Sequence, residues 1–201
     1  MNANSQAQQN RVSAPPAAGV APTLAPVTYD VDTAHAVAGF KVRHLMVSHV
    51  RGELGPIGGT VWIDDQDVTR SRIEVSIDAR KIATRDEKRD EHLRSADFLD
   101  VANHPTVTFK STRVERAGGD DLRVTGDLTI RGTTRPVTLT VESLAPAVTD
   151  PWGNTKRGAT AHAKIHRKEW GLQWNMGLEA GGVVVGEEVN IEIEVELLKR
   201  K

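Results

Sequence analysis

A run of eight ionisable residues, 85–92 (RDEKRDEH), contains the groups that proton-transfer chemistry would need. Asp90 or Glu91 beside His92 could form a general acid/base pair. The same run is also typical of the solvent-exposed face of a surface helix. On such a face, acidic and basic side chains three or four residues apart attract each other. Because charge runs of this kind usually face solvent, we interpret the run as a surface helix and predict no catalytic residue in it.

Seven histidines raise the question of a metal site. His162 and His166 are four residues apart in a strand-like run, so both would point to the same side of a strand. His44 and His49 are five apart and share no helical face. The sequence has no cysteine, no HExxH motif and no supporting carboxylate spacing. We therefore predict no metal site and no cofactor.

Other signatures of catalysis and of nucleic-acid binding are missing from the sequence. There is no G-x-S-x-G motif, no phosphate-binding loop and no dinucleotide fingerprint. The 26 basic and 27 acidic residues leave a net charge of −1, which provides no electrostatic basis for binding nucleic acid. By elimination, the chain is predicted to be a binding protein and not an enzyme.

One helix is expected near the middle of the chain. Thr84 and Glu87 match a capping box, in which each side chain satisfies a free backbone N–H at a helix start. The helical pattern should end before Pro105, because the residue preceding a proline is disfavoured in the α conformation. Apolar residues at three-residue steps would place one stripe against a core: Leu93, Ala96 and Leu99.

The rest of the chain alternates apolar and polar residues with the period of β-strands. Residues 44–50 are expected to form a brief helical turn, and the glycines in 52–59 to mark corners where a sheet curls. Eight or nine strands with one apolar face predict an all-β protein, either a closed antiparallel barrel or a sandwich. The predicted strands cover residues 28–31, 36–43, 60–64, 72–79, 106–114, 122–130, 137–141, 159–166 and 189–198.

A barrel of about eight strands has an interior that side chains fill or that holds one small ligand. The inward faces here consist mainly of small aliphatic residues, and the chain has only three Phe and one Tyr. Composition alone does not distinguish a fully packed barrel from a barrel that holds a ligand.

The first 26 residues form an Ala/Pro-rich leader, which we predict to be disordered because it lacks large apolar side chains. Residues 27–201 form the barrel domain. No transmembrane segment is expected, since no apolar run approaches about 18 residues. The leader also lacks the apolar core of a signal peptide. We expect a cytoplasmic location, with export as the alternative if a native N-terminus is missing.

Four ordered motifs resemble the YceI-like, polyisoprenoid-binding family of bacterial proteins. They are AVAGFKVRHLMVSHVRGEL (36–54), RDEHLRSADFLDVANHPTVTFKST (89–112), VTGDLTIRGTTRPVTL (124–139) and HRKEWGLQWN (166–175). The resemblance implies a lipocalin-like antiparallel β-barrel of about eight strands with a short helical insertion. It further implies an internal pocket for a polyisoprenoid or related amphiphilic lipid, with an isoprenoid quinone as one candidate, and a homodimer.

On this basis we expect the ligand to lie among inward-facing apolar residues, with a few polar residues orienting its head group. The predicted polar contacts are His44, Arg94 and Asn175. The predicted apolar contacts are Phe40, Val42, Leu45, Met46, Ile73, Val75, Ile77, Phe98, Val107, Phe109, Leu128, Ile130, Val137, Leu139, Ile165, Trp170 and Trp174.

Three functions remain open from the sequence. The first is carriage, storage or sequestration of an isoprenoid-type lipid without chemistry. The second is an enzyme that isomerises, cyclises or hydrolyses a lipid-like substrate in the barrel, which would need a titratable pair inside it. The third is an interaction module in which the leader binds a partner and the barrel is a scaffold.

Overall fold

A computed structural model describes residues 24–142, 144–179 and 181–201. The prediction of a disordered leader falls almost wholly on residues 1–23, which lie outside the described residues. The described part contains one α-helix, α1 (Glu87–Arg94), and three short 3₁₀ helices, η1 (Val68–Arg70), η2 (Ala79–Lys81) and η3 (Arg167–Trp170). Its strands are β1 (Val27–His44), β2 (Ser48–Glu53), β3 (Ile57–Ile63), β4 (Arg72–Asp78), β5 (Thr106–Gly118), β6 (Asp121–Ile130), β7 (Thr133–Glu142), β8 (Val148–Thr149), β9 (Thr155–His166) and β10 (Val185–Lys199).

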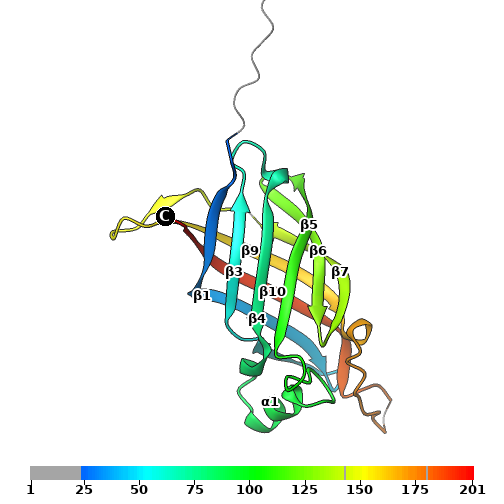
Figure 1. Cartoon of the computed structure of the whole chain (residues 1–201). Coiled ribbons are helices and arrows are strands. Elements are labelled where there is room, and N and C mark those ends of the chain that lie inside the picture. Colours follow the sequence, from blue (N-terminus) through cyan, green and yellow to red (C-terminus); the bar gives the residue numbers. More distant parts are fainter. Residues whose placement is uncertain (1–23, 143, 180) are drawn as a thin grey trace, which may run out of the picture.

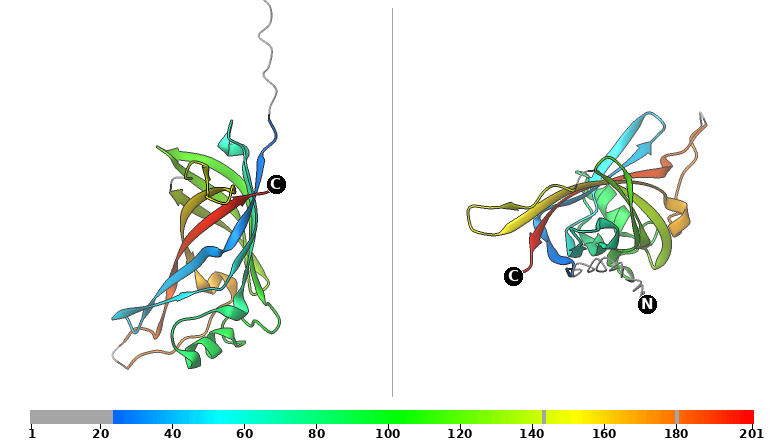
Figure 2. Two further views of the ribbon diagram at one scale, coloured as in Figure 1. Left: turned by 90° about the vertical axis from the view of Figure 1, so that its left-hand side faces the viewer. Right: turned by 90° about the horizontal axis from the view of Figure 1, so that it is seen from above.

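Eight of these strands close into an antiparallel barrel (Figures 1 and 2). Their order is β10-β1-β3-β4-β5-β6-β7-β9, and β9 pairs with β10 to complete the ring. This confirms the predicted all-β barrel with a short helical insertion. The barrel has a helix end, where α1 lies, and a termini end, where β1 begins and β10 finishes (Figure 1).

The alternating sequence pattern decides which residues line the barrel. In β10, Ile191, Ile193 and Leu197 face the interior, whereas the intervening Glu192 and Glu194 face outward. Because the period of a strand is two, each strand contributes one apolar face to a shared core. The core therefore follows directly from the alternation that the sequence shows.

The strand β1 is a single strand over residues that the sequence pattern predicted as two strands, 28–31 and 36–43. Its register against β10 shifts between Val31 and Ala36, which marks a bulge where the strand bends. Before the bulge β1 pairs with β3, and after it β1 pairs with β2. One long, bent strand thus belongs both to the barrel and to a hairpin that projects from its helix end (Figure 2, left).

The helical turn predicted over residues 44–50 is wrong. His44 ends β1 and pairs with Ser48, the first residue of β2, and Leu45–Val47 form the turn between them. Leu45 and Met46 adopt left-handed backbone angles, with φ of 50° and 61°. The Arg43 guanidinium donates hydrogen bonds to the Met46 carbonyl, at 3.1 Å from Nε and 2.7 Å from Nη2, and so holds the turn.

The helix α1 is shorter than predicted and has a different cap. The Asp86 carboxylate accepts the N–H of Arg89 at 3.1 Å and caps the helix, so the predicted Thr84–Glu87 capping box is wrong. Thr84 is buried and donates its hydroxyl hydrogen to the buried Asp90 carboxylate instead. Asp90 therefore has a structural role, and only part of the charged run faces solvent.

The helix ends at Ser95, whose N–H is shared between the carbonyls of Glu91 and His92. As a result Ala96 is exposed, and the predicted apolar stripe is interrupted. Phe98 and Leu99 follow in the next turns and are buried against the barrel.

Candidate ligand-binding cavity

The barrel interior holds a cavity of about 150 Å³ whose lining is almost entirely apolar. Among the described residues, only two polar ones, Ser71 and Thr108, belong to this lining, and no Asp, Glu, His, Lys or Arg does. The Ser71 hydroxyl accepts the Asp64 N–H at 3.1 Å. The lining residues are Val31, Leu54, Ile57, Val61, Ile63, Val68, Ser71, Ile73, Val75, Ile77, Val107, Thr108, Phe109, Val114, Leu122, Val124, Leu128, Ile130, Val137, Leu139, Val141, Leu144, Ala159, Ala161, Ala163, Ile191, Ile193, Val195 and Leu197.

The cavity is elongated along the barrel axis. Its lining on β5 extends from Val107 to Val114, a strand length of about 23 Å at about 3.3 Å per residue. Ile73, Val75 and Ile193 point inward from their strands but are only partly buried, because their inner surfaces border the cavity. A small volume spread over this length describes a narrow tube, which suits a linear apolar chain better than a compact molecule.

Phe109 and Gly126 determine part of the shape of this tube. A Cβ atom at Gly126 would lie 2.5 Å from the Phe109 ring and 2.5 Å from the Lys110 carbonyl oxygen. Glycine therefore lets the aromatic ring lie across β6 inside the barrel, where any side chain would displace it.

Nine of the predicted contact residues line the cavity. The structure thus brings together residues from β4, β5, β6 and β7 that the sequence placed in separate strands, and their contact with a ligand remains a prediction. These nine are Ile73, Val75, Ile77, Val107, Phe109, Leu128, Ile130, Val137 and Leu139.

The other predicted apolar residues lie outside the lining. Val42, Phe98, Ile165 and Trp170 are buried in the core. Phe40 and Trp174 are partly buried against it, and Leu45 and Met46 are exposed at the hairpin turn. Phe98 and Trp174 form an aromatic cluster with His92 at the helix end, with ring centroids 4.7–5.3 Å apart.

The three predicted polar contacts also lie away from the cavity lining. The Arg94 guanidinium donates to Glu87 at 2.9 Å, and the Asn175 amide exchanges hydrogen bonds with the backbone of Val185 at 2.7 and 3.0 Å. His44 ends β1, where its carbonyl accepts the Val47 N–H. Arg94 and Asn175 thus fix local structure around the helix end.

The side chain of Arg157, at the termini end, was not among the predicted site residues. Arg157 is opposite Leu197 and in phase with Ala159 and Ala161, so its side chain starts from the inner face of β9. Its Nη1 donates to Asp65 at 2.9 Å, whereas its Nε is buried without a hydrogen-bond partner among the described residues. The phase of Arg157 with the alanines was the signal that could have revealed it.

Tyr29 lies beside this arginine and is 2 % exposed. Burial raises the pKa of the Tyr29 hydroxyl, and the nearby Arg157 charge lowers it in part. The hydroxyl therefore stays protonated at neutral pH. The termini end thus offers hydrogen-bond donors next to an apolar tube, an arrangement that can hold an uncharged or anionic oxygen.

Much of the lining on β3, β9 and β10 was also absent from the predicted site. The last strand showed the clearest alternation in the sequence, with Ile191, Ile193, Val195 and Leu197 in one phase. That phase was sufficient to assign these residues to the barrel interior. What the sequence could not show is which strands close the ring beside them.

The shortest strand pairing in the described barrel ring is the seam between β7 and β9. Within the described residues, these strands pair only over Thr140–Glu142 and Thr160–His162. Below the seam, η3 covers the gap: the Trp170 indole donates to the Leu128 carbonyl at 3.1 Å, and Arg131 donates to the Gly171 carbonyl at 3.1 Å. Trp170 is therefore part of the cover of the cavity and not of its lining.

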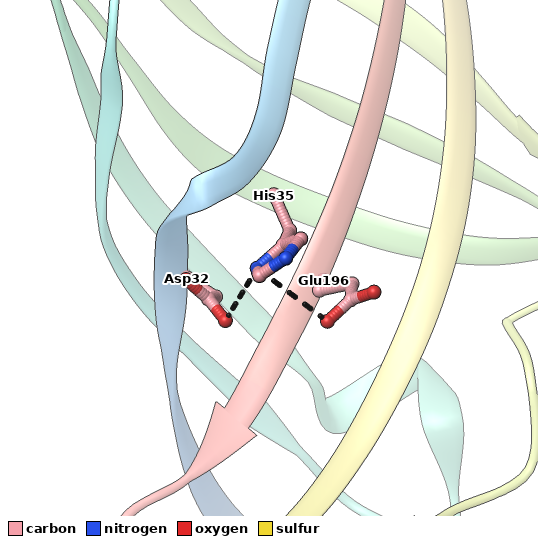
Figure 3. A group of neighbouring side chains, drawn as sticks. All are labelled: Asp32, His35 and Glu196. Carbon is pink, nitrogen blue, oxygen red and sulfur yellow. Dashed lines mark hydrogen bonds and ion pairs between the residues drawn. The ribbon is translucent and has the colours of Figure 1, made fainter.

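One side-chain cluster has the geometry of a metal site. Asp32, His35 and Glu196 converge beside the β1 bulge (Figure 3). However, the Lys156 ammonium donates to both carboxylates, at 3.0 Å from Asp32 and 2.8 Å from Glu196. Because a cation already neutralises these oxygens, the donor set does not favour a metal ion. His162 is 3.5 Å from Glu142 and forms no cluster with His166 among the described residues.

Comparison with known proteins places this barrel in a family. A family model described as a YceI-like domain matches residues 29–197. The chain belongs to the YceI-like family. Protein YceI of Escherichia coli is 36% identical over 172 residues, which are 86% of both chains. A UPF0312 protein of Vibrio cholerae is 37% identical over 147 residues, 72% of this chain and 77% of the relative.

Two solved structures share the fold. BcnA of Burkholderia cenocepacia superposes with a TM-score of 0.70 at 22% identity, covering 83% of this chain and 98% of BcnA. A polyisoprenoid-binding domain from Saccharophagus degradans, implicated in plant cell wall breakdown, has a TM-score of 0.61 at 15% identity and covers 87% and 99%. In the described part of this YceI-like chain, no helix has the length and apolar character to cross a membrane.

Proposed function

We propose that this YceI-like barrel binds a polyisoprenoid or a related amphiphilic lipid in its interior, for carriage, storage or sequestration. The observation that carries the proposal is the narrow, elongated cavity lined almost only by aliphatic side chains. Each Å² of apolar surface that a bound chain removes from water contributes about 25 cal/mol, without any polar partner. A solved relative of the same fold is described as a polyisoprenoid-binding domain, which supports this ligand class.

The lining supports binding without catalysis. Hydrolysis, isomerisation or cyclisation would need an acid, a base or a nucleophile within reach of the substrate. Among the described residues that line the cavity, only Ser71 and Thr108 carry such a group; the Ser71 hydroxyl is engaged with the Asp64 backbone, and Thr108 is exposed on the outer face of β5. The enzyme alternative therefore has less support than a carrier.

The polar head group is proposed to reach Arg157 at the termini end of the tube. The buried Nε–H of Arg157 has no acceptor among the described residues. Such a donor costs free energy unless a ligand or water satisfies it. A quinone carbonyl or a phosphate oxygen would supply the missing acceptor.

Native purification followed by solvent extraction and mass spectrometry tests the ligand class. A near-stoichiometric prenyl lipid would support the proposal and identify the head group. A protein that contains no lipid and takes up no added isoprenoid would contradict it.

A matched pair of variants tests the location. Val75→Trp places a large ring in the cavity and should abolish isoprenoid uptake, because the tube is too narrow for both. Ser76→Trp, on the outer face of the same strand, should leave uptake unchanged. Far-ultraviolet circular dichroism should show the β-sheet signal in both variants, and equal uptake by the two would overturn the assignment.

A further inference from the structure

Exposed apolar side chains gather at the projecting helix end of the molecule. Leu45, Met46 and Val47 form the turn of the β1–β2 hairpin and are 39%, 48% and 79% exposed. Met176, in the loop before β10, is 59% exposed. We call these four residues the apolar tip.

The two loops form one surface. The Leu45 N–H donates to the Val184 carbonyl at 2.9 Å, and the Val184 N–H donates to the Met176 carbonyl at 3.0 Å. A Cβ atom at Gly182 would lie 3.0 Å from the Met46 side chain. The hairpin and the loop project side by side in both views of Figure 2.

The tip is held in a costly conformation. Leucine and methionine rarely adopt the left-handed backbone region that Leu45 and Met46 occupy. The two hydrogen bonds from Arg43 to the Met46 carbonyl maintain this geometry. This strained turn lowers the stability of the fold and exposes three large apolar side chains to solvent. Such an arrangement indicates a contact surface.

Basic residues border the tip on one face of the hairpin. Lys41 pairs with Arg51 across β1 and β2, and Arg43 pairs with His49. These four residues, the basic rim, form no ion pair among the described residues, and like charges placed directly opposite each other destabilise a sheet. Desolvation, followed by the charges of the other three residues, lowers the pKa of His49.

The acidic residues around the tip lie on other segments, farther along the strands or paired with lysines. No Asp or Glu occurs between Lys41 and Arg51. Glu187 and Glu188, at the start of β10, are close to the end of the hairpin and are ion-paired with Lys168 and Lys164. Glu179 lies in the neighbouring loop, Glu53 ends β2, and Glu192 and Glu194 follow on the outer face of β10. A chain with a net charge of only −1 therefore concentrates unpaired positive charge beside exposed apolar side chains.

We propose that the apolar tip and the basic rim dock on an anionic lipid surface. The apolar side chains would enter the boundary between head groups and acyl chains, and the rim would lie against the anionic head groups. This surface would bring the helix end of the barrel to the membrane from which an isoprenoid lipid is taken, a purpose that rests on the proposed function. The docking itself requires no bound lipid.

Vesicle sedimentation of lipid-stripped protein tests the docking separately from cargo binding. The protein should sediment with vesicles that contain phosphatidylcholine and phosphatidylglycerol, and much less with phosphatidylcholine alone. Added salt should weaken the binding because it screens the rim. Protein that stays in the supernatant with the anionic vesicles would overturn the proposal, even if it still takes up isoprenoids.

Two variants separate the contributions of rim and tip. Lys41→Gln with Arg51→Gln should weaken binding to anionic vesicles by about 30-fold, since each basic residue at an anionic surface contributes about a fivefold factor. Leu45→Ser, Met46→Ser and Val47→Ser together should reduce binding to both kinds of vesicle. The matched control, Arg116→Gln with Arg123→Gln, removes the same charge from β5 and β6 and should bind like the unmodified protein.

A fluorescent label reports on insertion directly. The chain has no cysteine, so Val47→Cys provides a single site for an environment-sensitive dye. Its emission should shift to the blue on addition of anionic vesicles, whereas the same dye on Asp120→Cys, in the β5–β6 turn, should not respond. Equal responses at the two sites, or similar losses in the rim and control variants, would also overturn the proposal.

Discussion

Within the described part of the chain, Arg157 has the one buried side-chain nitrogen or oxygen that lacks a hydrogen-bond partner. Its ion pair with Asp65 is partly exposed and contributes little, since such pairs are typically worth 1 kcal/mol or less. Its buried Nε–H has no acceptor among the described residues. The arginine therefore costs stability in the free barrel, and a ligand head group would reduce this cost.

Arg157→Met should separate recognition from folding. We expect the free energy of unfolding to change by less than about 1 kcal/mol, because an unsatisfied donor is removed together with a weak ion pair. Affinity for an isoprenoid with a quinone or phosphate head group should fall roughly tenfold or more, whereas affinity for the bare hydrocarbon should not change. Titration calorimetry with the two ligands measures the two affinities. Equal losses of affinity for both ligands would exclude a head-group role for Arg157.

The ionisation of Asp64 makes the stability of the folded protein depend on pH in the acid range. The N–H of Asp67, then that of Gln66, and the Arg70 guanidinium at 2.6 Å all favour its charged form. These contacts lower the pKa of the Asp64 carboxyl in the folded state. Its contribution to stability is therefore complete above the unfolded pKa of about 3.9 and is lost as the pH falls through the lower folded pKa.

Asp64→Asn should remove this dependence. The variant should be less stable than the unmodified protein at neutral pH, and the difference should shrink as the pH falls below about 4. Urea unfolding at a series of pH values measures the difference. A difference that stays constant with pH would mean that the charge of Asp64 does not contribute.

At the scale of elements, η3 is the part of the fold that controls the seam between β7 and β9. It follows β9 directly, and the buried Arg167 ties it to the start of β10 by donating to the Gly186 carbonyl at 2.8 Å. Trp170 fastens the other side to β6 through the Leu128 carbonyl. Because few ladder hydrogen bonds close this seam, η3 is the element whose movement would open the wall.

Trp170→Phe tests this role by removing one hydrogen bond. Leaving the Leu128 carbonyl without its donor should cost about 1–3 kcal/mol of unfolding free energy and should speed release of a bound isoprenoid. Trp152→Phe is the matched control, since Trp152 is 82% exposed and should affect neither quantity. Stopped-flow release of a fluorescent isoprenoid measures the rate, and equal rates in the two variants would assign the exit elsewhere.

The elements also show how far the sequence could lead. The alternation of apolar and polar residues predicted the strands and predicted that Val75 and Leu139 face inward. It could do so because one face of each strand is buried, and every second residue lies on that face. It did not predict the β1–β2 hairpin turn, since leucine and methionine at left-handed angles depend on a hydrogen bond from Arg43 that no local pattern encodes. Likewise, Thr84 satisfied a capping pattern but is buried against Asp90, because the packing of the barrel outweighs local preference.

The predicted polar contacts lie outside the cavity lining for a related reason. Arg94 and Asn175 occur in motifs that resemble the family, but the fold uses them to hold loops at the helix end. Arg157 was hidden because a charged residue in a strand normally faces outward. Its phase with Ala159 and Ala161 was the one local signal of an inward side chain, and the register against Leu197, a long-range contact, establishes it.

For the whole molecule, ligand binding should appear as added stability. A ligand that binds only the folded barrel, at about 100 times its dissociation constant, stabilises it by about 2.7 kcal/mol. For a chain of this size that corresponds to a rise in melting temperature of roughly 5–10 °C. Differential scanning fluorimetry with isoprenoids of increasing length should show the rise levelling off once the tube is filled; no rise at any length would contradict an internal site.

The homodimer and the cytoplasmic location remain predictions. Sedimentation velocity of the purified protein measures the first, and fractionation of the producing cell measures the second. The dimer also bears on docking, since two apolar tips on one face of an assembly would bind a membrane with higher avidity than one.

The pairing of β1 with β10 has a consequence for how the protein is made. Tyr29 lies opposite Lys199, so the ring joins the two extremes of the described chain. During synthesis the first strand must wait for the last 15-residue strand to emerge, with its apolar face and one hydrogen-bonding edge uncovered. Such non-local closure is slow and exposes the nascent chain to aggregation. No tube exists until β10 has emerged from the ribosome, so the barrel must acquire its lipid after that point or fold around it.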